Sequence, residues 1–508
     1  MSISSRGKHT VDKDLGRITD IEEATGFVAR GLVAPGLALV FLVLAGMLAS
    51  IYVFGEPRAL VVVVAAAVGA YLALNIGAND VANNVGPAVG AKAITMAGAL
   101  AMAAVCESLG ALLAGKAVVA TISTAIVVPE AVSDPTILIH IMLAALISSA
   151  LWINFSTWIG APVSTTHAIV GGVMGAGAVA AGIEAVNWLT MAAIATSWIA
   201  TPVLGAAVAI MFQYLIKTAI IYQDDKIAAA RRWIPVLVAV MAGAFAAYLV
   251  PMLHSASTWQ TSMWIGLGFF AATWAVSHRS IARQSQGMEN RNRSLRRLFR
   301  LPLVGAAALL SFAHGANDVA NAIGPLAAIV HAARQGNVAD VVDIPRWVMM
   351  IGALGISCGL LLYGPKLIRI VGGEITKLNP MRAFSVALAV AIIVIAASWF
   401  GMPVSSTHIA VGAVFGVGFF REWYIAHSSH RRAFLLRQRL LKPGQPNMRR
   451  DPEDEEAPRR QLSREELNRR RLVRRTHLTN IVTAWATTVP ASAALAALLF
   501  TALGIFSS

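Results

Sequence analysis

Two nearly identical polar stretches interrupt long apolar runs of the chain. GANDVANNVGP occupies residues 77–87 and GANDVANAIGP occupies residues 315–325. An aspartate inside an apolar run is costly and usually faces a cavity or a polar partner. In the first copy, Asn79, Asp80 and Asn83 are spaced so that they can share one face of a helix. Because carboxylate, amide and backbone oxygens are ligands for a hard cation, the pattern indicates a cation site that is built twice.

The residues around the first aspartate also suggest a local break in the helix. Gly77, Gly86 and Pro87 flank it, and they permit an unwound turn whose free carbonyls would add oxygen ligands. The alternative is that the aspartates and asparagines cap broken helices or join neighbouring helices by hydrogen bonds. The two roles can coexist.

A second pair of blocks has the composition of a helix start. PVSTTH occupies residues 162–167 and PVSSTH occupies residues 403–408, each after a glycine-containing break and before a glycine-rich helix. Proline suits the first turn of a helix, and Ser or Thr caps its N-terminus. We expect helices that begin within the membrane, as second arms of re-entrant hairpins. Free N–H groups and a dipole of roughly +0.5 charge make such a start an anion site without basic residues, whereas the alternative is an ordinary kink.

The balance of charge links the two kinds of block. Two aspartates and an oxyanion would gather several negative charges in a low-dielectric site, and helix dipoles offset only about one of them. The nearest basic residues, Lys92 and Lys116, lie near expected span ends, where their side chains can reach the membrane interface. The remaining charge requires mobile cations, so an anion should bind only together with sodium ions or protons. Obligate binding of both couples their fluxes, as in a symporter.

Other ionisable residues lie in apolar runs near these blocks. Glu107, in CESLGALLAG, is either a proton or cation site or a residue hydrogen-bonded within helix packing. His167 and His408 end the two PVS blocks, where they either relay protons or orient neighbouring groups by hydrogen bonding. His314 precedes the second aspartate motif, but Ile76 occupies the matching position in the first, so we assign His314 little weight.

The elements that must position these residues are transmembrane helices. Of the 508 residues, 57% are hydrophobic and 13% are charged, whereas soluble domains are about a quarter charged. A β-barrel would show short alternating strands instead. Several apolar runs reach the length of about 20 residues that spans a bilayer, namely 31–53, 136–158, 189–216, 233–251 and 380–400. We therefore expect an all-α, multi-pass protein of the plasma or inner membrane.

The net charge of +15 does not indicate a nucleic-acid partner. Lysine and arginine concentrate between apolar runs, which is the positive-inside pattern of cytoplasmic loops. Cys106 and Cys358 lie in apolar runs and form no metal or disulfide framework. The basic segments are 1–30, 217–232, 278–300 and 421–476.

The paired blocks belong to a longer internal repeat. ESLGALLAG (107–115) resembles ISCGLLLYG (356–364), SWIATPVLGAA (197–207) resembles AWATTVPASAA (484–494), and all blocks keep one order in both halves. Counting spans from a cytoplasmic N-terminus delivers the two aspartate motifs in opposite directions, which is typical of inverted-topology repeats. The expected division is a cytoplasmic segment 1–30, an extra helix 31–58, transport repeat 1 over 59–216, linking helices and basic loops over 217–300, and transport repeat 2 over 301–506 with a charged loop at 421–476.

At these residues the chain resembles the inorganic phosphate transporter family, which includes sodium–phosphate symporters, proton-coupled phosphate carriers and some sulfate permeases. The resemblance rests on the paired GANDVAN, PVSTTH and PVSSTH blocks and covers residues 59–216 and 301–506. It implies two inverted repeats with re-entrant hairpins and broken helices, a homodimer, and phosphate held between hairpin tips near the membrane midplane with cations beside it. Aspartate and asparagine in both halves are closer to the sodium-coupled than to the proton-coupled pattern.

The resemblance also implies roles for individual residues. The phosphate ligands would be Ser164, Thr165, Thr166, Ser405, Ser406, Thr407, Asn83 and Asn321. The cation-binding and coupling residues would be Asp80, Asp318, Asn79, Asn317, Glu107 and, in GGEITKLNPMRAF (372–384), Thr376. The two aspartates would be the candidate sodium ligands. No resident cofactor is expected, because phosphate and sodium ions or protons are cargo.

Three functions are compatible with these residues. The first is a secondary phosphate symporter, and the second is a permease of the same fold for sulfate or another oxyanion. Acidic residues near the anion favour phosphate, because phosphate can donate a proton to a carboxylate whereas sulfate cannot. The third, an intramembrane aspartyl protease, needs two acids that share a proton and leaves the doubled Ser/Thr hairpins unexplained. No GxxxxGK[ST] loop is present, which argues against pumping by ATP hydrolysis. We therefore expect a transporter rather than an enzyme.

Overall fold

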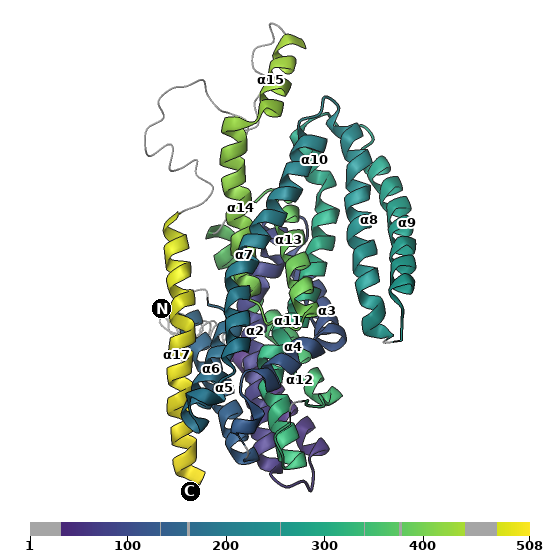
Figure 1. Cartoon of the computed structure of the whole chain (residues 1–508). Helices are drawn as coiled ribbons and strands as arrows, with labels where there is room; N and C mark the ends of the chain where they lie inside the picture. The colour runs from purple at the N-terminus through teal and green to yellow at the C-terminus, as the bar shows by residue number, and fades with distance from the viewer. Residues whose placement is uncertain are drawn as a thin grey trace, which may run out of the picture.

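The computed structural model describes residues 32–132, 134–159, 163–254, 256–339, 341–374, 378–441 and 475–507. Within these ranges the chain is helical, with short 3₁₀ and π turns and an isolated bridge between Val127 and Val186. Eleven of the described helices are long and apolar enough to cross a membrane. The predicted all-α, multi-pass membrane protein is therefore confirmed, and Figure 1 shows its helices as an elongated bundle.

The helices fall into two halves with a connecting segment. A helix over Leu32–Tyr52 comes first. The first half contains α2 (Ala59–Gly90), α3 (Met96–Ala114), α4 (Lys116–Ala120), α5 (Pro135–Trp158), α6 (Thr165–Ala181) and α7 (Trp188–Ile216). The connection contains α8 (Lys226–Leu253), α9 (Trp259–Gln284) and α10 (Asn292–Leu298). The second half contains α11 (Arg300–Gln335), α12 (Arg346–Glu374), α13 (Pro380–Trp399), α14 (Ser406–His427), α15 (Ser429–Leu441) and α17 (Arg475–Ser507).

Capping residues explain where many of these helices begin. The side chains of Thr95, Asp134, Asn187 and Asp225 each accept a hydrogen bond from a backbone N–H in the first turn of the following helix. One such cap contributes about 1 kcal/mol. The proline that opens α5 and α13 also presets the helical φ. Each of the five apolar runs found in the sequence corresponds to a helix of the structure.

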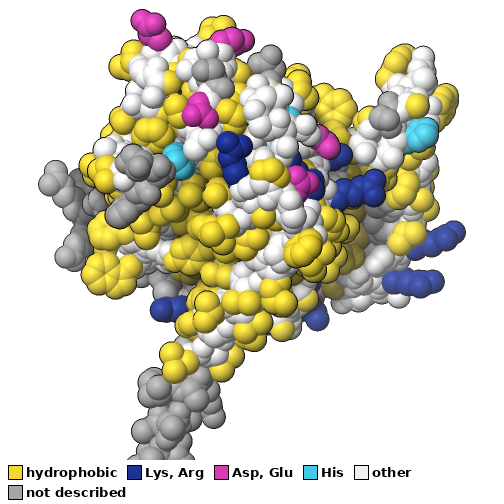
Figure 2. Space-filling model, turned by 90° about the horizontal axis from the view of Figure 1, so that it is seen from below, with side chains coloured by type: hydrophobic (Ala, Val, Ile, Leu, Met, Phe, Trp, Pro, Cys, Tyr) yellow, Lys and Arg dark blue, Asp and Glu magenta, His cyan; other side chains and the backbone are white. Residues whose placement is uncertain are grey.

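Charged side chains are distributed unequally between the two ends of the bundle. Figure 2 views the molecule from the end opposite α10 and α15 and shows mostly hydrophobic and uncharged side chains with a few scattered charged ones. Exposed arginines lie at the other end, on or beside α10 and α15: Arg291, Arg293, Arg297, Arg432 and Arg437. This is the arrangement expected if the basic loops face the cytoplasm.

Helices α2 and α11 lie side by side in the interior and carry the two aspartate motifs. Gly69 on α2 lies against Leu326 on α11, whereas Asp80 lies near His314. Since the residue number rises along one helix as it falls along the other, the two helices run antiparallel. The two motif copies therefore point in opposite directions.

The expectation that α2 unwinds near Gly77, Gly86 and Pro87 is wrong. Both α2 and α11 continue through their motifs without interruption. A Cβ atom on Gly77 would collide with the backbone of Ile356 on α12, so this glycine allows close packing of two helices rather than a break. Pro87 and the matching Pro325 each remove one backbone N–H from the helix, yet neither interrupts it. The breaks lie elsewhere, between α3 and α4 and before α6 and α14.

Glycines at helix crossings recur in pairs with the two halves exchanged. Lipid tails are as apolar as the side chains, so helix association in membranes depends on close packing of small residues. In each pair the glycine meets the backbone of the partner helix: Gly77 with Ile356 and Gly315 with Glu107, and Gly110 with Phe312 and Gly359 with Leu74. The contacts of one pair therefore become those of the other when the matching residues of the two halves are exchanged.

The helices that follow the PVS blocks pack against helices from the opposite half. Helix α6 packs on α17, where Gly171 and Gly175 closely approach Val489 and Ala493. In the matching contact, α14 packs on α7, where Gly412 and Gly416 closely approach Pro202 and Ala206. We refer to α6 with α17 as the first hairpin unit and to α14 with α7 as the second hairpin unit.

Candidate functional site

The two PVS blocks start helices inside the bundle, as predicted. Ser164 has an extended backbone, and its Oγ accepts a hydrogen bond from the backbone N–H of His167 at 3.2 Å. Ser405 makes the matching bond with the N–H of His408 at 3.3 Å. Both serines are buried, so the N-termini of α6 and α14 begin in the interior, where their remaining N–H groups suit an anion.

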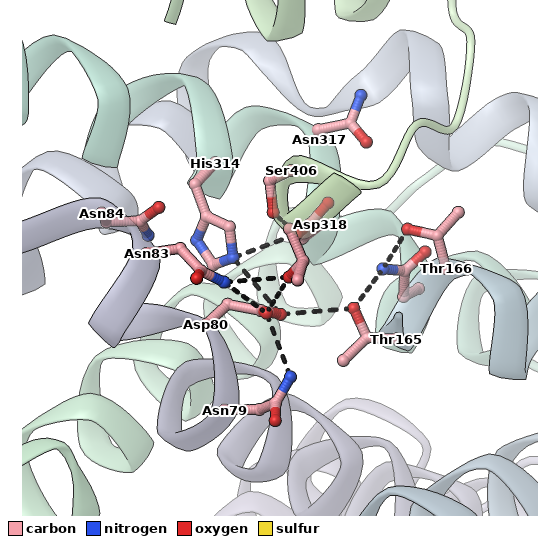
Figure 3. Close-up of polar contacts among 12 residues, drawn as sticks. Asn79, Asp80, Asn83, Asn84, Thr165, Thr166, His314, Asn317, Asp318 and Ser406 are labelled. Carbon is pink, nitrogen blue, oxygen red and sulfur yellow. Dashed lines mark hydrogen bonds and ion pairs between the residues drawn. The ribbon is translucent and has the colours of Figure 1, made fainter. Parts of the chain in front are cut away.

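Asp80 on α2 lies where the starts of α6 and α14 meet (Figure 3). Its Oδ1 accepts hydrogen bonds from the hydroxyl of Thr407 at 2.9 Å and from the amide of Asn79 at 3.0 Å. Its Oδ2 accepts one from the hydroxyl of Thr165 at 3.4 Å. Because Thr165 begins α6 and Thr407 lies in the first turn of α14, one carboxylate joins both helix starts.

Asp318 occupies the matching position on α11 and has fewer donors. Its Oδ2 accepts a hydrogen bond from the hydroxyl of Ser406 at 3.0 Å, whereas its Oδ1 has no hydrogen-bond partner. Asp80 and Asp318 are each 1% exposed. A buried carboxylate with an unpartnered oxygen is costly, so this site favours an additional positive group.

His314 connects three carboxylates and was missed by the sequence interpretation. Its Nε2 lies 3.0 Å from Oδ2 of Asp318 and 3.7 Å from Oδ2 of Asp80. Its Nδ1 lies 3.3 Å from Oε2 of Glu107, whose Oε1 accepts a hydrogen bond from Asn84 at 2.8 Å. All of these residues are at most 1% exposed. The little weight given to His314, because the other repeat has isoleucine there, is therefore corrected.

The polar residues around His314 have no polar equivalents in the other repeat. Asn84, Glu107 and His314 correspond to Ala322, Ile356 and Ile76. The contact between His314 and Glu107 joins α11 to α3, and the bond from Asn84 joins α2 to α3. The site therefore has a symmetric part, made by the repeated motifs, and an asymmetric polar extension that reaches α3.

The asparagines of the motifs hold the hairpins in place. Asn79 donates to the carbonyl of Val163 at 3.4 Å, and Asn317 donates to the carbonyl of Met402 at 3.1 Å, so each secures the break of its own half. Two further asparagines reach the opposite half. Asn83 donates to Thr407 Oγ1 at 2.9 Å, and Asn321 donates to Thr166 Oγ1 at 3.2 Å.

The structure brings together nearly all residues predicted for the site. The serines and threonines of both PVS blocks, the aspartates and asparagines of both motifs, and Glu107 lie in one connected cluster. Thr376 lies outside the described residues. Lys92 and Lys116 are exposed, so neither neutralises the buried acids.

This cluster can hold a cation and an anion next to each other. Asp80, His314 and Asp318 each offer a ligand atom, and these atoms lie within 4.8 Å of one another. Carboxylate and hydroxyl oxygens suit a hard cation. The two helix N-termini and their hydroxyls suit an oxyanion. Asp80 lies between the cation ligands and the helix N-termini, because a hydroxyl from each helix start donates a hydrogen bond to its carboxylate.

Comparison with known proteins identifies the family. The model described as "Phosphate transporter family" matches residues 76–496. A Helicobacter pylori protein named "Putative phosphate permease" is 43% identical over 530 residues, which cover 97% of this chain and 99% of that protein. A Pyrococcus abyssi protein with the same description is 39% identical, over 70% of this chain and 87% of the relative. A solved structure described as "The sodium-dependent phosphate transporter" has a TM-score of 0.75 and 33% identity, covering 88% of this chain and 99% of that one. The chain therefore belongs to the phosphate transporter family.

Proposed function

We propose that this phosphate transporter imports inorganic phosphate by symport with sodium ions, and that phosphate binds between the starts of α6 and α14. Membership of the family identifies a membrane transporter and not an enzyme, which removes the protease alternative. The observation that carries the symport proposal is the position of Asp80, whose carboxylate accepts hydrogen bonds from hydroxyls of both helix starts.

The position of Asp80 suggests how cation and anion binding depend on each other. While Thr165 and Thr407 donate their hydroxyl protons to Asp80, these protons are not available to an oxyanion. A cation bound at the carboxylate would replace those donors. The two hydroxyls could then turn toward phosphate, which needs hydrogen-bond donors. Cation binding would thus prepare the anion site.

The number of charges leads to the same dependence. Ionised Asp80, Asp318 and Glu107 carry three negative charges, and a protonated His314 would offset one of them. Phosphate adds at least one more negative charge, and the dipoles of α6 and α14 together offset about one. A net negative charge remains in a buried site, and small cations are required to balance it.

We assign the residues to two adjacent shells. The phosphate shell would contain Ser164, Thr165, Thr166, Ser405, Ser406, Thr407, Asn83 and Asn321. The cation shell would contain Asp80, Asp318, Asn79, Asn317 and Glu107, with His314 balancing the acids. Sodium is favoured over the proton because most of the candidate ligand atoms are oxygens and because the similar solved structure is described as sodium-dependent.

Burial of the site implies movement during transport. The six serine and threonine residues of the phosphate shell are at most 5% exposed. Phosphate can therefore enter or leave only when the hairpin tips shift relative to α2 and α11. We propose that the repeats over 59–216 and 301–506 alternate this access across the plasma or inner membrane. On the basis of the family resemblance, we also propose that the protein is a homodimer.

Radiolabelled phosphate uptake into proteoliposomes tests the proposal. Sodium and pH gradients should be imposed separately, with sulfate as a competitor and liposomes containing the Asp80→Asn variant as a control. We expect an inward sodium gradient to drive accumulation that sulfate does not inhibit. Accumulation driven equally well by a pH gradient without sodium would contradict sodium coupling, and inhibition by equimolar sulfate would contradict phosphate selectivity.

A further inference from the structure

Four aromatic rings form a continuous row behind the two hairpin tips. The ring of His167 lies 3.8 Å from that of Trp198 and 4.4 Å from that of His408, measured between ring centroids. The ring of His408 lies 3.5 Å from that of Trp485. His167 and His408 are matching residues of the two repeats, as are Trp198 and Trp485. We call these four residues the ring row.

Every contact in the ring row joins one hairpin unit to the other. His167 is on α6 and Trp485 on α17, which form the first unit, whereas His408 is on α14 and Trp198 on α7, which form the second. Within each unit, close glycine contacts fix the two helices together. The ring row is therefore a contact between two internally well-packed bodies, each of which carries one helix start of the phosphate site.

The two histidines are unusual occupants of such a contact. His167 is 5% exposed and His408 is 2% exposed. His167 faces the backbone carbonyl of Trp485 without the geometry of a hydrogen bond, and Nε2 of His408 has no hydrogen-bond partner. Buried unpartnered polar atoms oppose folding. Phenylalanine would fill the same space without that cost, so the histidines need a reason that this conformation does not supply.

The hairpin tips are held from two sides. In front, Thr165 and Thr407 are bonded to Asp80, and Asn321 is bonded to Thr166. Behind, the ring row joins the same two helix starts, because His167 and His408 lie in the first turns of α6 and α14. Opening the front for phosphate therefore requires relative movement at the back.

We propose that the ring row separates each time the transporter opens, and that its histidine nitrogens then gain water as hydrogen-bond partners. The inference rests on the proposed transport function. In this account the unpartnered nitrogens weaken the closed contact, so that the two hairpin units can part at an adequate rate. The histidines set how readily the site opens and do not themselves bind phosphate in the closed state.

The double variant His167→Phe/His408→Phe tests this role. It keeps ring contacts but removes the unpartnered nitrogens, so we expect a higher Tm in detergent and a maximal uptake rate lowered about tenfold, which corresponds to about 1.4 kcal/mol. His140→Phe, which changes a half-buried histidine on α5 outside the ring row, is the matched control and should leave the rate unchanged. A double variant that transports at the wild-type rate would overturn the proposal.

A reversible cross-link provides a second test that does not depend on tolerance of phenylalanine. His167→Cys/His408→Cys would be made in a Cys106→Ala/Cys358→Ala background, with each single cysteine as a control. Mercuric ion should bridge the two thiols and lower uptake at least tenfold, and dithiothreitol should restore it. Undiminished uptake by the bridged protein would refute the need for separation. Failure of the proposed function would be seen separately, as absence of sodium-driven uptake in the unbridged protein.

Discussion

Replacing His314 with isoleucine is the sharpest perturbation of the asymmetric part of the site. The matching position of the first repeat is Ile76, so His314→Ile introduces a side chain that the fold already accepts there. It removes the shared partner of Asp80, Asp318 and Glu107 at once. We expect both stability and transport to fall.

The size of the effect follows from what each acid retains. Asp80 keeps its hydroxyl and amide donors, Asp318 keeps Ser406, and Glu107 keeps Asn84 at one oxygen only. Removing one partner of a buried ion pair costs roughly 3–5 kcal/mol. Since each acid keeps at least one hydrogen-bond donor, we take the lower limit of about 3 kcal/mol. This free energy corresponds to a factor of about 100 in an equilibrium constant.

Thermal unfolding in detergent and phosphate uptake by proteoliposomes measure the two consequences. The decisive comparison adds Glu107→Ile, because the double variant reproduces the Ile76–Ile356 pair of the other repeat and removes the stranded acid. We expect the double variant to recover most of the lost Tm while uptake stays low, since Asp80 and Asp318 still lack the imidazole of His314. Such non-additivity is typical of residues in direct contact.

Two results would refute this reasoning. Wild-type Tm and uptake for His314→Ile would mean that the histidine is not paired with the acids. Full recovery of uptake in the double variant would mean that His314 serves only to balance Glu107 and has no function toward the two aspartates.

The other predictions concern the repeated motifs. Asp80→Asn and Asp318→Asn should each lower phosphate uptake about 100-fold, since each loses a buried charge to which we assign cation binding; normal uptake with normal membrane insertion would exclude that aspartate from coupling. Ser405→Ala removes a helix cap worth about 1 kcal/mol and should raise the KM for phosphate roughly fivefold, whereas an unchanged KM would indicate a purely structural start of α14. Gly315→Ala should lower the Tm because its Cβ would collide with the backbone of Glu107, while Gly86→Ala, which has nothing within 4 Å, should not; equal Tm values would contradict the packing argument.

The positions of most helices and the start of each hairpin helix could be predicted from the sequence. Apolar runs of sufficient length indicate spans, and Ser164 and Ser405 are capping residues two positions after a proline. The spacing of Asp80 and Asn83 correctly placed them on one face of a helix, where their side chains lie 3.5 Å apart. These features depend on neighbours in the chain, which is why they were predictable.

The pairing of His314 could not be predicted, because it depends on how α3 lies against α11. Comparison of the repeats even argued against it, since Ile76 showed that the fold does not need a histidine at that position. A residue that breaks the internal symmetry can therefore still lie at the centre of the polar cluster, as the contacts of His314 with three carboxylates show. Asn84 and Glu107 break the symmetry in the same place, and considering the three together would have been the available signal.

Gly77 illustrates a different limit. Glycine both permits a helix break and allows two helices to approach closely, and these meanings cannot be distinguished without the partner helix. The motif suggested a break with free carbonyls, whereas α2 is continuous and Gly77 packs on Ile356. The packing of α6 on α17 and of α14 on α7, each from the opposite half of the chain, could not be predicted either. No local sequence pattern indicates which distant helix packs on a glycine face.

The dependence of phosphate affinity on sodium, measured at equilibrium with the purified protein, tests the central claim most directly. Phosphate binding would be titrated at fixed neutral pH in sodium and in choline, a cation too large for the site, and sodium binding would be titrated with and without phosphate. We predict that phosphate binds at least tenfold more tightly in sodium, and that phosphate tightens sodium binding by the same factor, because the coupling is reciprocal. Equal phosphate affinity in the two salts would contradict the account.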